Sequence, residues 1–587
     1  MSSNIFYPFS TIYPGSGYSA SVRAVIRITL KAPRGDGFSG LISAQGAVQR
    51  YGRTMERLNL KYRTGGLEAF ANFGYFGGKH EDNNTIDMLT RSSVQWTQLM
   101  EQGGHAVIND FYAKAGFSYM FGKGHSIGAY YNNGFKKSDS RHSGFSRILA
   151  DGKPYDELSV DIRENGKTMP RHHANVYYNG KAGNLGIDFN MDFMWRKKRS
   201  ELHNGESSGN FEDATVSSHT VGRSRLFAEK LVLSHPLWKG GIEVGQEYTS
   251  SRFATDYRTD AAMLTSADSR VDESNIAGFV GLSQSFGAWN VAAGLRYEHV
   301  AFSYLENGQR REDMSRTYDN LFPSFSVATT LRKVQLALSY THKTQRPSYS
   351  SLDGTIDYIN RFTFEGGNPY LRPEKIHSVE LSGAWSRFFG QISYSYKKDP
   401  VLNTTVPYGD DGEIKLITKE NFPKIQQVEA FVGGQFRLGI WQPKVNAGIM
   451  AQWLSIDYDG RRMSLNNPIG LVQGQNAIHL PADIWLNVDL QWMSAGNGEN
   501  ARVNSTSYVN AKLYKAFFNN SFSVTLEADD IYNRNVRDFT FYNKDVTIFK
   551  TSSITNRTFL LTLQYTFNVT RDRYRGRGAG GAEMNRF

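Results

Sequence analysis

The sequence predicts an all-β chain that folds as a transmembrane antiparallel β-barrel of about 22 strands. Three observations lead to this prediction: strand-like segments alternate apolar and polar residues, tight and loose connections alternate along the chain, and aromatic residues gather near strand ends. A soluble sandwich would show the same alternation in any single strand. The prediction therefore depends on strand number and connection lengths over the whole chain.

The last predicted strand, Arg557 to Phe567, has the clearest alternation. A period of two residues is that of a β-strand. One face carries Phe559, Leu561, Leu563, Tyr565 and Phe567, and the other carries Thr558, Thr562, Gln564 and Thr566. In a membrane barrel the apolar face contacts lipid and the polar face lines the interior.

Composition favours one large β-domain. The 587 residues include 13% aromatic residues and no cysteine, and no linker rich in proline or serine divides residues 36–567. Nowhere do about 18 apolar residues follow one another, so no transmembrane helix is predicted. The formal charge of +11 could indicate nucleic-acid binding. The Lys and Arg residues are dispersed along the sequence, however, and we expect no nucleic-acid partner.

The first 35 residues differ from the rest. The start, MSSNIFYPFS, lacks the positive and apolar regions of a secretory signal. Within this segment Ser21 to Leu30 is predicted to be one strand, and the regular pattern of strands and turns begins near Gly37. We therefore divide the chain into residues 1–35, a barrel over residues 36–567 and a basic tail over residues 568–587.

From Gly37 onward, tight and loose connections alternate. Tight connections are predicted at Gly65-Gly66, Phe121 to His125, Gly180 to Asn184, Pro236 to Gly240, Phe286 to Trp289, Leu331 to Lys333, Arg387 to Phe389, Gly439 to Gln442, Pro481 to Asp483 and Phe517 to Ser521. Loose, polar connections are predicted at Tyr51 to Thr54 and at residues 78–109, 138–171, 199–222, 254–274, 304–317, 345–375, 399–426, 459–468, 494–505 and 532–555. Short periplasmic turns and long extracellular loops are typical of outer-membrane barrels.

The two faces of the predicted strands differ in role. Aromatic residues near strand ends are expected at the membrane interfaces: Trp195, Trp238, Trp289, Tyr340, Tyr396, Trp441, Trp453, Phe517 and Phe567. Polar residues on the opposite faces are expected to line the lumen: Asp188, Asn190, Asp192, Gln391, Ser393, Ser523, Thr525 and Glu527. A barrel of this width is too wide for its side chains to fill, so it needs a plug or leaves an aqueous hole.

Several segments resemble one family. The run SYTHKTQRPSYSSL (Ser339 to Leu352), followed by GGNPYLRPEKIHSVELSG (Gly366 to Gly383), together with LEADDIYNRN (Leu526 to Asn535) and the tail RDRYRGRGAGGAEMNRF (Arg571 to Phe587), is similar to TonB-dependent outer-membrane receptors. The likeness is to the branch common in Bacteroidetes, whose barrel is called the outer-membrane β-barrel family. The early segment IYPGSGYSASVRAVIRITLKAP resembles the last strand of the plug domain of these receptors.

The resemblance implies a location in the outer membrane of a Gram-negative bacterium and a role in ligand capture and transport. Residues 1–35 would be a remnant of the C-terminal end of the plug, with most of the plug missing, and residues 568–587 a basic periplasmic tail. The ligand would be a siderophore, glycan, peptide or cofactor bound at the extracellular loops. Expected partners are outer-membrane lipid and lipopolysaccharide, a surface lipoprotein and, in an intact homologue, a TonB-type energy-coupling protein, whose contact segment this sequence lacks.

No enzyme motif is found, so we expect no catalytic residue, metal site or cofactor. The adjacent His172 and His173 would point to opposite faces of a strand, which makes them a poor chelate. The acidic runs Glu81-Asp82 and Asp410-Asp411-Gly412-Glu413 are interpreted as solvated turns, and Asp529-Asp530 as structural. Aromatic residues in the loops are interpreted as packing anchors more than as a surface for stacking a ligand: Tyr349, Tyr358, Phe362 and Phe364.

Two classes of function remain open at this point. One is a receptor barrel that passes a scarce ligand inward. The other is a passive pore, a surface-adhesion barrel or an inactive fragment without its plug.

Overall fold

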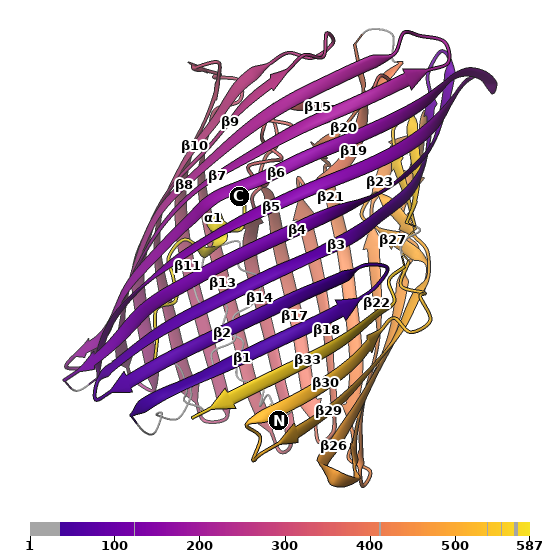
Figure 1. The fold of residues 1–587 in the computed structure, drawn as a ribbon. Helices are drawn as coiled ribbons and strands as arrows, with labels where there is room; N and C mark the ends of the chain where they lie inside the picture. Colours follow the sequence, from indigo (N-terminus) through magenta and orange to yellow (C-terminus); the bar gives the residue numbers. More distant parts are fainter. Residues whose placement is uncertain (1–35, 123, 410–412, 537, 553–554, 569–572) are drawn as a thin grey trace.

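The computed structural model describes residues 36–122, 124–409, 413–536, 538–552, 555–568 and 573–587. Within these residues, 22 strands form a closed antiparallel barrel (Figure 1). The barrel closes where the first strand, β1 (Gly37–Val48), pairs with the last, β33 (Thr558–Phe567). The predicted fold class is confirmed. The strand predicted over Ser21 to Leu30 lies outside the described residues.

Most barrel strands pair with their nearest neighbours in the chain. In order around the wall they are β1, β2 (Gly52–Thr64), β3 (Leu67–Arg91), β4 (Gln95–Phe121), β5 (His125–Ala150), β6 (Lys153–Ala182), β7 (Leu185–Ser208), β8 (Ala214–Leu237), β9 (Gly240–Thr259), β10 (Ala267–Phe286), β11 (Trp289–Glu306), β13 (Arg316–Leu331), β14 (Val334–Gln345), β17 (Glu374–Trp385), β18 (Phe388–Lys398), β21 (Lys424–Gln435), β22 (Trp441–Trp453), β25 (Ile469–Leu480), β26 (Ile484–Met493), β29 (Thr506–Phe517), β30 (Phe522–Asp529) and β33.

The remaining elements lie in the loops and the tail. The loop strands are β12 (Gln309–Arg310), β15 (Ile356–Asn360), β16 (Thr363–Gly366), β19 (Val401–Tyr408), β20 (Ile414–Asn421), β23 (Ser455–Tyr458), β24 (Arg461–Ser464), β27 (Gly496–Gly498), β28 (Ala501–Val503), β31 (Phe539–Asn543) and β32 (Val546–Ser552). A 3₁₀ turn, η1 (Pro481–Asp483), joins β25 to β26, and a short helix, α1 (Gly581–Met584), lies in the tail.

Tight turns occur at every predicted position, all at one end of the barrel. The turn between β2 and β3 illustrates why such turns need glycine. Gly65 has φ +51°, and a Cβ on Gly66 would lie 2.2 Å from the backbone oxygen of Met120 in the next hairpin. Glycine adopts the positive φ at position 65 and avoids the steric contact at position 66 at little cost in conformational energy, because it has no side chain.

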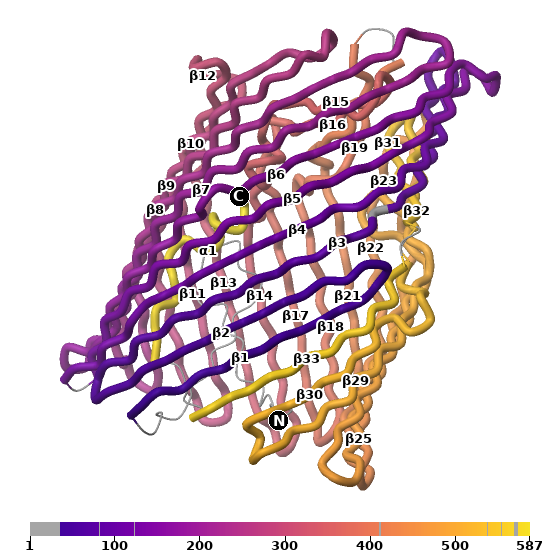
Figure 2. Tube along the Cα trace, viewed as in Figure 1, coloured from indigo at the N-terminus to yellow at the C-terminus, as the bar shows by residue number. Residues whose placement is uncertain are grey.

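The predicted loops in the first half of the chain are wrong. Residues 78–109 and 138–171 are mostly continuous strand, and the connecting turns shrink to residues 92–94 and 151–152. β6 reaches 30 residues. Toward the loop end the hydrogen-bonded wall continues (Figure 2), but the regular alternation of lipid-facing apolar residues ends while the backbone ladder goes on.

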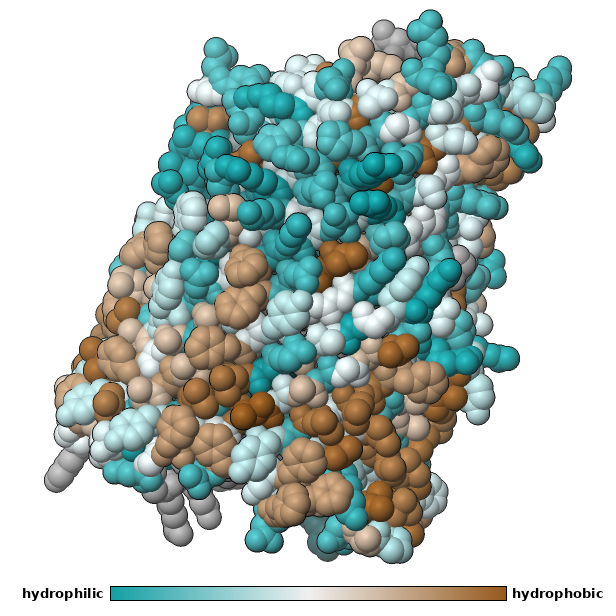
Figure 3. Space-filling view, viewed as in Figure 1, coloured by the Kyte–Doolittle hydropathy of each residue, from teal (hydrophilic) through white to brown (hydrophobic). Residues whose placement is uncertain are grey.

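Apolar side chains of the wall point outward. On β33, Phe559 and Tyr565 remain 56% and 46% exposed, whereas Thr558 on the opposite face is buried. Figure 3 shows the consequence for this face of the molecule: hydrophobic residues cover the turn end, and hydrophilic residues cover the loop end. Among the predicted interface aromatics, Trp238, Trp289, Trp441, Trp453 and Phe517 are exposed. None of the helices in the described ranges has the length and apolar content to cross a bilayer.

Candidate functional site: the occupied lumen

The C-terminal segment, residues 573–587, lies against the inner face of the barrel wall. Its first part binds polar side chains of the wall at three levels. The backbone N–H of Arg573 donates to Glu68 on β3 (2.8 Å), that of Arg577 to Asn190 on β7 (2.8 Å), and that of Ala579 to Asp192 on β7 (2.5 Å). The ring of Tyr574 packs between the rings of Tyr130 and Tyr177.

The end of the segment is held by charge and by aromatic contact. Arg586 forms a two-pronged ion pair with Glu273 on β10, with one N–O distance of 3.0 Å. Its guanidinium lies 4.2 Å from the ring centre of Tyr349, in the loop between β14 and β17. The ring of Phe587 lies 4.6 Å from the same tyrosine, and Arg196 on β7 donates to an oxygen of Phe587 (2.7 Å). The segment therefore connects strands β3, β7 and β10 of the wall with the loop between β14 and β17.

This placement corrects one sequence-based expectation. A basic tail over residues 568–587 was expected in the periplasm, but residues 573–587 lie within the barrel outline in Figure 1 and contact its inner face. The physical reason is charge. The inner wall carries carboxylates at Asp188, Asp192 and Glu273, and the tail supplies Arg577 and Arg586 as their partners.

A chain of buried charges surrounds the end of the segment. Arg296 on β11 lies 3.4 Å from Glu247 on β9 and 2.6 Å from Glu298 on β11. Glu298 in turn pairs with Arg346, which lies 3.6 Å from Glu583 in α1. Charges this deeply buried persist only when each has an opposite partner. The network therefore couples the wall, the loop and the tail.

Glu583 is the least well stabilised carboxylate of this network. The side chain is buried, and neither carboxylate oxygen accepts a hydrogen bond. Burial, together with the nearby negative charge of Glu247, raises the pKa of Glu583 to about 7, although Arg346 and Arg586 oppose the shift. The segment therefore docks most readily with this carboxyl protonated.

A small sheet of loop strands lies at the loop end of the lumen. β15, β16, β20 and β19 pair with one another, and the loop between β14 and β17 that carries the first two packs on the inner wall. Glu206 on β7 holds this loop: it accepts a hydrogen bond from the hydroxyl of Tyr358 (3.1 Å) and forms a buried ion pair with Arg361. Thr363 donates to Gln98 on β4 (2.9 Å).

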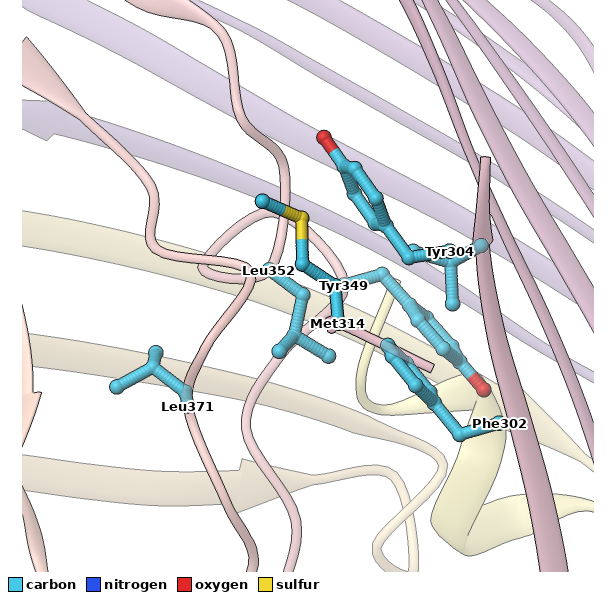
Figure 4. Packing of buried hydrophobic residues seen from close by; sticks show 7 residues of the cluster. Phe302, Tyr304, Met314, Tyr349, Leu352 and Leu371 are labelled. Atoms are coloured by element: carbon cyan, nitrogen blue, oxygen red, sulfur yellow. The ribbon is translucent and has the colours of Figure 1, made fainter. Parts of the chain in front are cut away.

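The predicted loop aromatics serve as packing anchors. Tyr349 and Phe364 are fully buried, and Tyr358 and Phe362 are nearly so. Figure 4 shows Tyr349, Leu352 and Leu371 of the loop with Phe302 and Tyr304 of β11, in one apolar cluster with Met314. None of these rings is free to stack on a ligand in this conformation.

Some of the residues predicted to line the lumen contact the tail or a neighbouring strand. Asp188, Asn190 and Asp192 bind the tail, and Ser523 is buried. Glu527 lies 3.6 Å from Lys512. Sequence reasoning missed Glu273, Glu298 and Arg346 as members of this site. The available signal was a charged residue on the inward face of a strand, as Glu273 is on β10.

The remaining sequence candidates are structural. His172 packs against Trp195 on the outer face, while His173 contacts Asp192 on the inner face (3.0 Å), so the two rings point apart as predicted. Asp530 accepts hydrogen bonds from the N–H groups of Arg534 and Asn535, both at 3.0 Å. Glu81 pairs with Arg50. Residues 410–412 lie outside the described part of the chain, and in that part no group of three His, Asp or Glu side chains is arranged to hold a metal ion.

Comparison with known proteins agrees with this architecture. The outer membrane protein beta-barrel family matches residues 178–565. No curated protein matches in sequence. The siderophore receptor PirA from Pseudomonas aeruginosa has a similar structure (TM-score 0.55, 10% identity, 92% of this chain and 81% of that chain). So does the FrpB iron transporter from Neisseria meningitidis (TM-score 0.55, 12% identity, 91% and 83%). At such low identities these two similarities show the fold alone.

Proposed function

Because the chain belongs to the outer membrane protein β-barrel family and lies in the outer membrane, we propose that it is the barrel of a TonB-dependent receptor. It binds a scarce ligand at its extracellular loops and passes it to the periplasm. A ferric siderophore is the first ligand class to test, because structures described as a siderophore receptor and an iron transporter share the fold. Glycans, peptides and cofactors are the other classes. Binding and transport, not catalysis, are the proposed activity.

The observation that carries this proposal is the double occupation of the lumen. The loop sheet of β15, β16, β19 and β20 lies at one end, and residues 573–587 lie below it. The loop that carries β15 and β16 meets this segment where the N–H of Tyr349 donates to the backbone oxygen of Arg586 (2.9 Å). A passive pore needs a continuous water path, whereas a receptor needs a path that opens on demand. The occupied lumen favours the receptor over the passive pore, the adhesion barrel and the inactive fragment.

The proposal extends to domains and partners. Residues 1–35, outside the described part of the chain, are assigned to the C-terminal end of a plug domain of the Bacteroidetes-type receptors. A TonB-type protein supplies energy to the intact receptor. Outer-membrane lipid and lipopolysaccharide surround the wall, and a surface lipoprotein is a further candidate partner at the loops.

Two measurements test the proposal. In planar bilayers the purified chain should be electrically silent at rest, and a large, permanently open conductance would establish the passive pore instead. Binding of a panel of ferric siderophores, read by quenching of tryptophan fluorescence, should then reveal a ligand. Uptake of that ligand by cells that express the intact receptor should stop when the TonB-type protein is deleted. Uptake that continues unchanged would contradict energy coupling.

A further inference from the structure

One stretch of the loop between β14 and β17 contacts both the tail and the loop end of the wall. Its first residues, 346–349, contact the tail. Its strands β15 and β16, with the turn between them, contact β7 and β4 toward the loop end. Only residues 350–355 separate these two contact regions. We call residues 346–366 the strap.

The end of the tail packs on the strap as well as on the wall. The N–H of Tyr349 donates to the backbone oxygen of Arg586 (2.9 Å). The guanidinium of Arg586 donates to the backbone oxygen of Pro347 and to the hydroxyl of Tyr349, both at 3.1 Å. The ring of Phe587 lies 4.6 Å from that of Tyr349, which is fully buried and stacks on Phe253 of β9. If the strap moves away, the tail loses all of these contacts.

The middle of the strap is locked into the loop and against the wall. The N–H of Asn368 donates to the backbone oxygen of Ser351 (2.7 Å). Asp353 is buried and accepts a hydrogen bond from the hydroxyl of Ser269 on β10 (2.6 Å). A Cβ on Gly367 would lie 2.1 Å from the backbone oxygen of Asp353, so two parts of the loop are in close backbone contact here. Because packed segments switch between discrete arrangements and do not deform gradually, the strap docks and undocks as one unit.

The other contact region of the strap is held by one buried carboxylate. Glu206 on β7 accepts a hydrogen bond from the hydroxyl of Tyr358 and pairs with Arg361. Arg361 also donates to the backbone oxygen of Glu212 (2.8 Å), and its guanidinium lies 5.1 Å from the ring centre of Phe211. Both of these residues are in the exposed turn between β7 and β8. This contact therefore lies beside solvent at the loop end, whereas the contact with the tail is buried.

From these contacts we propose that the strap couples the loop end of the barrel to the tail. A ligand that binds at the extracellular loops and separates Arg361 from Glu206 undocks the strap, and the undocked strap no longer holds Arg586 and Phe587. Capture of ligand at one end of the lumen thereby releases the segment that occupies the lumen below. The inference rests on the proposed function for its trigger, whereas the link between strap and tail is tested without any ligand.

The test changes the loop end and measures the tail. In the part of the chain that the structure describes, no hydrogen bond or ion pair of Arg361 reaches residues 573–587. In the purified, detergent-solubilised variant Arg361→Ala, backbone hydrogen exchange of residues 580–587 should nevertheless be roughly 10-fold faster than in the unaltered chain, a factor typical of coupled sites. Because coupling is reciprocal, Arg586→Met should speed chymotryptic cleavage of the strap by a similar factor.

A matched control loosens a different loop contact. Gln452 on β22 is buried and donates to the backbone oxygens of Leu465 (2.9 Å) and Glu499 (2.8 Å), which belong to other loops. Gln452→Ala should leave the exchange of residues 580–587 unchanged. The double variant Arg361→Met, Glu206→Met replaces the whole buried pair by apolar groups and should restore protection of the tail. This recovery separates loss of coupling from misfolding.

Unchanged exchange of the tail in folded Arg361→Ala would overturn the inference. An equal increase in Gln452→Ala would also overturn it, because that result would show general loosening of the barrel. Combining Arg361→Ala with Arg586→Met should speed exchange of the tail no further than Arg586→Met alone, and additive effects would mean that the two contacts are independent. A coupled strap in a chain that binds no siderophore would refute the proposed ligand and leave the coupling intact. Siderophore uptake by a chain with an uncoupled strap would do the reverse.

Discussion

Arg586→Met is the most direct test of whether the C-terminal segment closes the lumen. The substitution keeps an unbranched side chain but removes the charge that faces Glu273. It also removes the hydrogen bond to the backbone oxygen of Pro347 (3.1 Å) and the contact with the ring of Tyr349. Glu273 would then remain on the wall, only 5% exposed and without its main partner.

The size of the effect follows from burial. Breaking a buried ion pair by removing one partner costs about 3–5 kcal/mol, mostly because the other charge is left uncompensated. That free energy would shift the docking equilibrium of the segment by at least about 100-fold. The double variant Arg586→Met, Glu273→Met should recover most of the docking, because it replaces the whole pair by apolar groups.

Hydrogen exchange of residues 573–587 measures docking directly, and bilayer conductance measures its consequence. Arg586→Met should exchange faster in this segment and should show channel openings that the unaltered chain lacks. The control is Arg575→Met, because Arg575 is an exposed basic residue of the same segment that forms no ion pair with the described residues. If Arg586→Met behaves like Arg575→Met in both assays, the segment is not held by this pair and the reasoning fails.

Three further predictions concern the tail, the loop and the turns. Docking of the tail should weaken as pH rises from about 4.5 to about 7, because docked Glu583 keeps its proton up to a pKa of about 7 while the free side chain loses it near 4.5. Protection of residues 573–587 from hydrogen exchange should therefore be lower at pH 8 than at pH 5. The variant Glu583→Gln should abolish that difference. Arg361→Ala should leave the carboxylate of Glu206 buried without its ion-pair partner and destabilise the docked loop by about 3–5 kcal/mol. The measurement is the rate of chymotryptic cleavage between residues 346 and 373, which should rise. Cleavage at the rate of the unaltered chain would contradict the role of this pair. Gly66→Ala should lower the yield of heat-modifiable, folded barrel, because the new Cβ would lie 2.2 Å from the backbone oxygen of Met120. The control Gly46→Ala has open space around its Cβ and should fold normally. Equal yields of the two variants would refute the steric argument.

Local sequence signals were sufficient for the turn end of the barrel and insufficient for the loop end. Turns such as that at Gly65 are set by backbone conformation within a few residues, and Phe559 to Phe567 must alternate because lipid lies on one side of the strand. Beyond the bilayer that constraint vanishes. Residues 78–109 are mostly polar and lack a regular alternation, so their pattern could not be told from that of a loop, although the backbone ladder continues through them.

The site was less predictable because its contacts join distant parts of the chain. Glu273 and Arg586 are 313 residues apart, and Arg346 joins the same network from a third segment. A basic, glycine-rich tail carries no periodic pattern that would indicate a buried position. Only the inward direction of Glu273 on β10 identifies its need for a cation, and that direction follows from register, which single-strand patterns do not fix.

The same consideration explains how charges are distributed over the two faces of the wall. Lys and Arg residues that look dispersed in sequence are sorted by the strand register onto opposite faces of one wall. Over β7 to β11 the inner face presents Asp192, Glu247, Glu273 and Glu298, and their partners come from the wall itself, the loop and the tail. Over β5 and β6 the outer face presents cations such as Arg141, Arg147 and Arg163, each of which lies close to a carboxylate of the same strand or its neighbour. Strand register, and not clustering in the sequence, therefore decides which charges meet in the folded barrel.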